Sequence, residues 1–454
     1  MSDQTAQSGG ARPADDVSRR NVLRAAGAGA AFMGFGGLLA ACGGGIKGSN
    51  SGSSTKAITI GWIHPLTGSL AGFGAPDNWV IQKVKATSQF KNGIKVGGKT
   101  YPVTIKSYDS QSSVTRAGNL ARTAILNDNV DLLLASSTPE TVNAVASQAE
   151  SLGTPLICAN IPWESWYLNL FPHGNPVHAT EKAKYVTMYF LGAEHLAECF
   201  IPMWNRIHAQ LHTDKVVAAA FPNDSDGNAF RAVFPPIVSG AGYKFDMSSA
   251  YPDGTTNYSS MISQFKADKA DFFTNVPLPP DFATMWKQAI QQGFRPKLAT
   301  VAKVLLFPTD AYAMGSEAYN IATDAWWAPS LPWKSSLTGE TCQSMADQFE
   351  TGHGQWNSNI SNYSLFESAY AALKTVSDPH DKNEVADAIH KVNIQALAGP
   401  LDFASGGPAP GVAITPPVGV QWQKGTKYPL EMQVVDNTLQ PHAKITADLL
   451  PTNQ

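Results

Sequence analysis

Polar side chains stand where the apolar, β-branched runs of this chain end. Residues 57–63 form such a run before His64, and residues 130–135 form another before Ser137 and Thr138. Side chains at the carboxyl ends of parallel strands face a crevice, and small molecules bind there. This rule selects ten candidate ligand-binding residues: His64, Leu66, Ser137, Thr138, Asn160, Trp163, Asn223, Asp224, Pro277 and Lys303.

Two of these strand ends allow a binding or a purely structural interpretation. Ser137 and Thr138 can donate hydrogen bonds to a carboxylate beside the N–H groups of a helix whose first turn contains Pro139. The same hydroxyls can instead cap that helix. Residues 224–228 resemble a fragment of a calcium loop, but no Glu follows at the EF-hand spacing. We therefore favour helix capping by Asp224.

Motifs for catalysis, metals and cofactors are weak in this chain. Glu194, His195 and Cys199 have helical spacing, but a zinc site needs further partners, and no His-Glu-x-x-His motif is present. Gly72 and Gly74 lack the third glycine of a dinucleotide loop, and no Gly-x-Ser-x-Gly elbow occurs. We predict no metal, no cofactor and no catalytic residue.

Strand, polar turn and helix alternate along most of the chain. Strands are predicted at residues 57–63, 100–108, 130–135, 154–159, 215–221, 243–250, 271–276, 298–304 and 322–328, with a late antiparallel pair at 418–423 and 431–435. Helices are predicted at 70–85, 112–127, 142–152, 184–206, 228–239, 258–267, 282–292, 339–351, 365–377 and 382–392, with an ordered loop at 164–183. This order predicts an α/β fold in which two similar halves with mainly parallel sheets enclose a cleft.

The first part of the chain has the pattern of an export signal. Arg19 and Arg20 precede an apolar, Gly/Ala-rich stretch that ends in Ala41 and Cys42. The arginine pair resembles a twin-arginine signal, and the small residues before Cys42 are similar to a bacterial lipobox. We expect cleavage of residues 1–41, lipidation of Cys42 and a flexible Gly/Ser-rich tether over residues 42–56. The protein would then be anchored to the outer face of the cell membrane or lie in the periplasm.

Composition sets limits on the remaining possibilities. The chain has 454 residues, is 43% hydrophobic and has a net charge of −3, so it can bury a large core and has no basic excess for binding nucleic acid. Besides Cys42, the cysteines are Cys158, Cys199 and Cys342. One disulfide is possible in an oxidising compartment, but the pairing cannot be deduced from sequence.

Short motifs in a fixed order identify a family resemblance over roughly residues 57–435. They include Gly61 with residues 65–68, residues 97–101, residues 108–111, residues 136–138, residues 222–224 with Gly227, and residues 399–401. The chain resembles the receptor subunits of ABC importers of the leucine/isoleucine/valine-binding type. The resemblance implies two Rossmann-like lobes joined by three hinge crossovers, which close on a solute without altering it. It also implies ABC permease and ATPase subunits as membrane partners; we expect the receptor to be a monomer.

The resemblance also implies lobe boundaries and a site. We expect an N-terminal lobe from residues 57–175 with 325–395 and a C-terminal lobe from 176–324 with 396–450. Where amino-acid-binding members carry small residues and Thr, this chain has Asn160 and Trp163, and where they carry an acidic residue it has Lys303. The predicted ligand is therefore an apolar or aromatic carboxylate, with Trp163 as stacking wall and Lys303 as counter-charge.

Two alternatives remain open. The first is an exported α/β hydrolase that uses His64 with a carboxylate such as Asp109 or Asp224. The second is a receptor-like sensor that signals through a partner without delivering a solute.

Overall fold

Two sheets of mainly parallel strands organise residues 55–452, the part of the chain that this computed structural model describes. In spatial order the six-stranded first sheet contains β15 (Val412–Ile414), β7 (Val186–Phe190), β6 (Leu156–Ala159), β5 (Leu132–Ser136), β1 (Ile58–His64) and β4 (Val103–Asp109). The seven-stranded second sheet contains β17 (Leu430–Asp436), β16 (Val418–Lys424), β12 (Ala322–Ala325), β11 (Leu298–Val301), β10 (Phe272–Asn275), β8 (Val216–Ala220) and β9 (Lys244–Met247).

Nearly all strand pairs are parallel because helical crossovers separate successive strands. The exceptions are the pairs β12–β16 and β16–β17, which are antiparallel and extend one side of the second sheet. Two small antiparallel hairpins lie outside the main sheets: β2 (Ile94–Val96) with β3 (Lys99–Tyr101), and β13 (Asn393–Ala396) with β14 (Gly399–Asp402).

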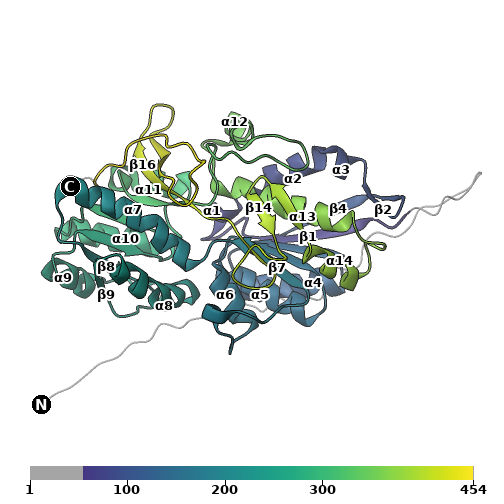
Figure 1. Cartoon of the computed structure of the whole chain (residues 1–454), viewed down its shortest axis with the longest axis horizontal. Helices are drawn as coiled ribbons and strands as arrows, with labels where there is room; N and C mark the ends of the chain where they lie inside the picture. The colour runs from purple at the N-terminus through teal and green to yellow at the C-terminus, as the bar shows by residue number, and fades with distance from the viewer. Residues whose placement is uncertain (1–54, 453–454) are drawn as a thin grey trace, which may run out of the picture. The chain divides into compact units, whose positions relative to one another are not determined.

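Helices cover both sheets, and we call each sheet with its helices a lobe (Figure 1). The first lobe has α1 (Ala71–Gly74), α2 (Asp77–Ala86), α3 (Ser88–Lys91), α4 (Val114–Leu126), α5 (Pro139–Ser151), α6 (Trp163–Leu170), α12 (Cys342–His353), α13 (Tyr363–Leu373) and α14 (Lys382–Ile389). The second lobe has α7 (Ala193–Leu211), α8 (Ser225–Gly240), α9 (Ser259–Ala267), α10 (Pro279–Gln291) and α11 (Pro308–Met314). Short 3₁₀ turns lie at η1 (Pro176–His178), η2 (Gly315–Ala318) and η3 (Ser358–Asn362).

The chain crosses between the two sheets three times. It leaves the first sheet after β7, returns to first-lobe helices after β12, and crosses again between β15 and β16. The predicted α/β class, with two lobes of mainly parallel strands, is confirmed. The lobe boundaries predicted at residues 175, 324 and 395 remain predictions; the sheet memberships add that β7 and β15 pair with strands of the first sheet.

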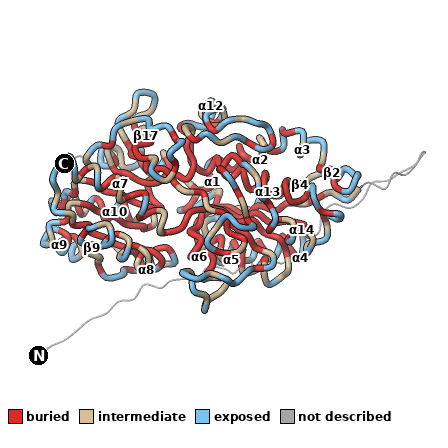
Figure 2. The backbone as a smooth tube through the Cα atoms, in the orientation of Figure 1, coloured by how far each residue is buried: buried red, intermediate tan, exposed pale blue. Residues whose placement is uncertain are grey.

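Apolar strands explain why the sheets lie in the interior. Every residue of β5 and of β8 is buried, as expected for parallel strands covered on both faces. Figure 2 shows the buried residues following the strands and the exposed ones following the outer loops and helix faces. Cys158, Cys199 and Cys342 are buried and free, so no pair of them forms the disulfide that sequence left possible.

Three sequence predictions differ from the structure. The predicted helix at 184–206 is wrong in its first turns, because residues 186–190, VTMYF, form strand β7 before α7 begins. These β-branched and aromatic residues suit a buried strand better than an exposed helix. The predicted loop at 164–183 contains helix α6, and the predicted helix at 70–85 is divided into α1 and α2 by Pro76.

The predicted export signal, Cys42 and most of the predicted tether lie outside the described residues. Within the described part of the chain, none of the helices combines the length and the apolar character needed to cross a bilayer.

Candidate functional site

A cavity lies where the carboxyl ends of strands from both sheets meet. Its wall takes residues from strands β7 and β12, from the loops after β5, β6, β7, β10, β11 and β12, and from four helices: Phe73, Thr138, Pro139, Asn160, Pro162, Phe190, Leu191, Leu196, Asp226, Phe230, Val276, Ala302, Lys303, Leu306, Asp324 and Trp326. We call it the interlobe cavity. It encloses about 40 Å³, whereas pockets for small organic molecules measure roughly 300–1,000 Å³. An organic solute therefore enters only if the lobes or the lining side chains move apart.

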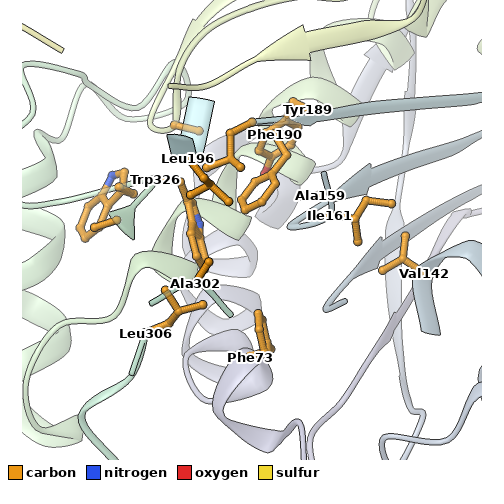
Figure 3. Close-up of a cluster of buried hydrophobic side chains, with 14 of the residues drawn as sticks. Phe73, Val142, Ala159, Ile161, Tyr189, Phe190, Leu196, Ala302, Leu306 and Trp326 are labelled. Carbon is orange, nitrogen blue, oxygen red and sulfur yellow. The ribbon is translucent and has the colours of Figure 1, made fainter. Parts of the chain in front are cut away.

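Most of the wall is apolar and aromatic. Figure 3 shows Phe73, Phe190, Leu196, Leu306 and Trp326 gathered from both lobes. The rings of Phe190 and Trp326 meet edge to face, with centroids 5.0 Å apart. Such a wall favours an apolar body in the bound molecule.

Lys303 holds three carboxylates at one side of the cavity. Its Nζ atom lies 2.8 Å from Asp226 Oδ2, 3.1 Å from Asp224 Oδ2 and 3.0 Å from Glu140 Oε1, and its side chain is 4% exposed. Asp224 and Asp226 belong to the second lobe, whereas Glu140 lies in the first turn of α5. The ammonium group therefore joins the two lobes.

The turn before α8 places two of these carboxylates. Asp224 is the N-cap of α8, and its Oδ1 accepts a hydrogen bond from the Gly227 N–H at 2.6 Å. Asp224 therefore caps the helix with one oxygen and pairs with Lys303 through the other. A side chain at residue 227 would collide with the carbonyl oxygen of Pro222, so glycine permits the tight turn.

Burial and charge shift the titration of this cluster. Burial raises the pKa of Asp226 to about 7, although Lys303 opposes the shift. Burial alone would lower the pKa of Lys303, but Asp226, Glu140 and Asp224 raise it well above its ordinary value. Lys303 thus stays charged at neutral pH, while Asp226 titrates there.

Asn160 contributes an acceptor whose orientation is fixed by its neighbours. The Asn359 amide nitrogen donates to the Phe73 carbonyl oxygen at 2.7 Å, so its Oδ1 must accept from the Asn160 amide nitrogen at 2.8 Å. The same nitrogen also donates to Asn362 Oδ1 at 2.9 Å. The remaining atom, Asn160 Oδ1, is buried and has no hydrogen-bond partner in the described part of the chain.

Asp324 places a second carboxylate on the wall, away from Lys303. The residue lies in β12, lines the cavity and is 4% exposed. Among residues 55–452, no Lys, Arg or His forms an ion pair with it. Burial raises the pKa of Asp324 to about 7, and hydrogen bonds from its own backbone and from Thr323 only partly oppose this.

The backbone is strained at two cavity positions. Asn160 and Lys303 have φ angles of 65° and 67°, in the left-handed region that residues other than glycine rarely adopt. Strain of this kind clusters at binding sites. The left-handed conformation changes the direction in which the Asn160 and Lys303 side chains leave the ends of β6 and β11.

Three of the ten predicted ligand-binding residues line the cavity: Thr138, Asn160 and Lys303. Thr138 begins α5 but makes no side-chain capping hydrogen bond. Ser137 is buried beside it, and its Oγ has no hydrogen-bond partner among the residues that the structure describes. Their contact with a ligand remains a prediction.

The other predicted residues lie off the cavity wall. The Leu66 N–H donates to Asp109, Asn223 is exposed, and Pro277 is buried next to the lining residue Val276. Trp163 is buried and donates its indole N–H to Glu194 Oε1 at 2.9 Å. The predicted stacking role of Trp163 thus has no support from this geometry.

His64 belongs to a hydrogen-bonded relay in the first lobe. Its Nδ1 lies 2.7 Å from Asp77 Oδ2 and its Nε2 lies 2.7 Å from Ser107 Oγ. Asp77 also accepts a hydrogen bond from Asn362, and the Trp62 ring stacks on His64 at 4.3 Å. The relay ties β1, β4, α2 and η3 together, and none of its members lines the interlobe cavity.

The sequence predictions missed most of the wall. Apolar lining residues such as Phe73 and Leu306 carry no signal that separates them from ordinary core residues. Asp324 did carry a signal in the sequence, because it is an ionisable residue that interrupts the apolar stretch at 322–328. Asp226 lies two residues after the predicted Asp224, within the same turn.

Glu140, Asp224 and Asp226 also have the spacing of a metal site. One oxygen from each lies within 4.8 Å of the others. Lys303 Nζ lies within 3.1 Å of an oxygen of each residue, which is where a cation bound by the three carboxylates would lie. The three carboxylates therefore pair with the ammonium group of Lys303.

Solved structures of solute-binding proteins share this two-lobed architecture. A leucine-binding protein, LivK, from Thermotoga maritima is 17% identical, covers 84% of this chain and 99% of its own, and superposes with a TM-score of 0.67. The branched-chain amino acid transporter substrate-binding protein LivJ from Streptococcus pneumoniae, in complex with isoleucine, is 13% identical over 87% of this chain and 100% of its own, with a TM-score of 0.63. A solute-binding protein of an ABC transporter from Rhodopseudomonas palustris, in complex with 3,4-dihydroxy benzoic acid, is 16% identical over 87% and 98%, with a TM-score of 0.61.

The fold and the cavity between two lobes define a type I periplasmic binding protein. The family model described as periplasmic binding protein matches residues 57–427. The chain belongs to this family, as the motifs in its sequence predicted.

Proposed function

We propose that this protein is the extracytoplasmic solute receptor of an ABC importer, which captures a small organic solute between its lobes and delivers it to a membrane permease. Proteins of this family bind small molecules and work with ABC transporters. The interlobe cavity carries the proposal, because residues at strand ends of both sheets form a single wall. A solute that contacts both lobes stabilises the closed arrangement, which the membrane permease would recognise.

The expected result of a thermal-shift screen is stabilisation by one class of solute. The panel contains amino acids, amines, aromatic acids, amides and polyols, tested on the purified exported chain. A solute at 100 times its dissociation constant adds about 2.7 kcal/mol to the free energy of unfolding. A panel in which no class raises the melting temperature would contradict the proposal.

The hydrolase alternative paired His64 with Asp109 or Asp224, but the partners of His64 in the structure are Asp77 and Ser107. The relay of Ser107, His64 and Asp77 has the hydrogen bonds of a nucleophile, base and orienting acid. We propose a binding role without turnover, because the relay lies off the cavity wall and its hydrogen bonds join secondary-structure elements. Recovery of every stabilising solute unchanged after incubation would support binding. Conversion of a solute, lost in Ser107→Ala, would support the hydrolase.

The solute class predicted from sequence was an apolar or aromatic carboxylate. The apolar wall supports the body of such a molecule, and the benzoic acid bound by the Rhodopseudomonas palustris protein is of this class. The predicted counter-charge, Lys303, already has three carboxylates within 3.1 Å. A carboxylate solute must displace at least one of them.

We also propose that Cys42 carries the lipid that holds the receptor at the membrane, in agreement with the extracytoplasmic location that the family implies. In cell fractionation the wild-type chain should follow the membrane and partition into detergent. Cys42→Ala should release the protein into the soluble fraction. Equal detergent partitioning of both forms would exclude this anchor.

A further inference from the structure

The polar atoms left over on the cavity wall are mostly hydrogen-bond acceptors. Asn160 Oδ1 and Asp226 Oδ1 are buried without partners, and the Asp324 carboxylate faces no cation within the described residues. Buried acceptors of this kind are normally satisfied by donors. A bound molecule that fits this wall must therefore bring donors to it.

Donors of the protein are scarce at the same wall. The Lys303 ammonium group has three hydrogens and three carboxylate partners. Trp326 Nε1 is the lining nitrogen donor without a partner among residues 55–452, and Thr138 adds a hydroxyl. The wall thus offers two uncharged donors, from Trp326 and Thr138, but no free cation to a carboxylate.

Most of the charged side chains around the cavity are carboxylates, so the charge there is mainly negative. Glu140, Asp224 and Asp226 share a single lysine, and Asp253 and Asp281 lie close enough to act electrostatically on Asp224. Asp324 adds a further carboxylate to the wall. A cleft lined by one sign of charge attracts the opposite ion and repels a like one. Burial strengthens both effects because solvent screening is weak there.

We propose that the solute is an organic cation, an apolar body with a protonated amine that pairs with the Asp324 carboxylate. The inference rests on the proposed receptor function and names its substrate class. Phe73, Phe190 and Leu306 contact the apolar body, and Trp326 next to Asp324 adds a ring face for the cation. Asn160 Oδ1 accepts a further hydrogen from the amine.

The test compares molecules that share a body and differ in charged groups. One series is phenethylamine, phenylalanine and hydrocinnamate; the other is isoamylamine, leucine and isocaproate. Each is titrated into the purified wild-type chain by calorimetry and by thermal shift. We expect the amine of at least one series to bind at least tenfold more tightly than the amino acid, and the carboxylate to bind most weakly.

Two variants separate the role of Asp324 from general effects. Asp324→Asn should weaken amine binding by about 10- to 100-fold, since it removes a charge-assisted hydrogen bond. Asp448→Asn, which changes an exposed carboxylate, should leave amine binding unchanged. Equal amine affinity in wild type and Asp324→Asn would overturn the assignment of Asp324.

The outcomes also separate this inference from the proposed function. Tighter binding of an amino acid or a carboxylate than of its amine overturns the cation inference while the receptor function stands. The same holds if the stabilising class in the wider screen is neutral or anionic. Absence of binding by every solute class overturns both.

Discussion

Lys303→Met is expected to lower the free energy of unfolding by about 3–5 kcal/mol, the cost of removing one partner from a buried charge cluster. Methionine keeps most of the apolar stem of lysine but removes the ammonium group, which leaves Glu140, Asp224 and Asp226 facing one another. Because Asp226 can take up a proton, part of the loss should be recovered at pH 6. Urea denaturation at pH 8 and pH 6 measures both effects.

Lys269→Met is the matched control for this variant. Lys269 is exposed and has a φ of 54°, so the same substitution is made in the same backbone region without a buried cluster. Its stability should stay within about 0.5 kcal/mol of wild type. If Lys303→Met were as stable as this control, the lysine would not hold the two lobes together.

The double variant Lys303→Met with Asp226→Asn should recover stability, because it removes one of the uncompensated charges.

Stability should fall as the pH rises from 6 to 8. Burial raises the pKa of Asp226 and of Asp324 to about 7 in the folded protein, above the ordinary value of 3.8. The folded state then holds protons that the unfolded state has already lost, so the stabilisation is present below this window and is lost through pH 7. Each group contributes about 1.4 kcal/mol across the two pH units.

Burial also raises the pKa of Asp253 and of Asp310 to about 6, so these carboxyls add to the loss of stability near pH 6, whereas His390 opposes it and Cys199 does not enter the window. His390, whose pKa burial lowers to about 4, opposes the trend by under about 1 kcal/mol because its unfolded form takes up protons towards pH 6. Cys199 on α7 faces Asp324, but its pKa is raised well above the ordinary value, first by burial, so it stays neutral. Urea denaturation curves at pH 6, 7 and 8 give the slope.

The variant Asp324→Asn measures how much one carboxylate contributes to the change of the free energy of unfolding with pH. The variant should lose about 1.4 kcal/mol less than wild type between pH 6 and pH 8 and should be about 1–3 kcal/mol more stable at pH 8. Asp448→Asn should follow the wild-type curve. Parallel curves for wild type and Asp324→Asn would show that Asp324 does not titrate in this window. A variant that gains stability while losing solute binding is typical of a residue retained for function.

The lobe contact and the pH dependence have a common origin in the buried carboxylates. Lys303 compensates the charge of Glu140, Asp224 and Asp226, whereas Asp324 has no cation beside it among residues 55–452. A cationic solute would compensate the charge of Asp324 as Lys303 compensates the charge of the other three carboxylates. Solute binding should therefore flatten the pH dependence that Asp324 causes.

The sequence by itself determined the class of fold and the family. Alternating apolar runs and amphipathic segments require strands and helices in βα order, and that order requires parallel sheets with a crevice at the strand ends. The same rule selected Thr138, Asn160 and Lys303, which line the interlobe cavity. It also selected Trp163 and Asn223, which lie elsewhere, because a strand end fixes where a loop begins but not where each of its side chains points.

Only the tertiary structure determines which charged groups and which hydrogen-bond acceptors meet at the site. Lys303 was expected to meet a ligand, but its partners come from a helix 163 positions earlier in the chain and from a turn 79 positions earlier. Asn160 presents an acceptor because Asn359, 199 positions away, takes its donor. Such contacts join residues distant in sequence, so local patterns contain no record of them. The physical reason is that burial removes water, and each polar atom must then find its partner in the folded chain or in the bound solute.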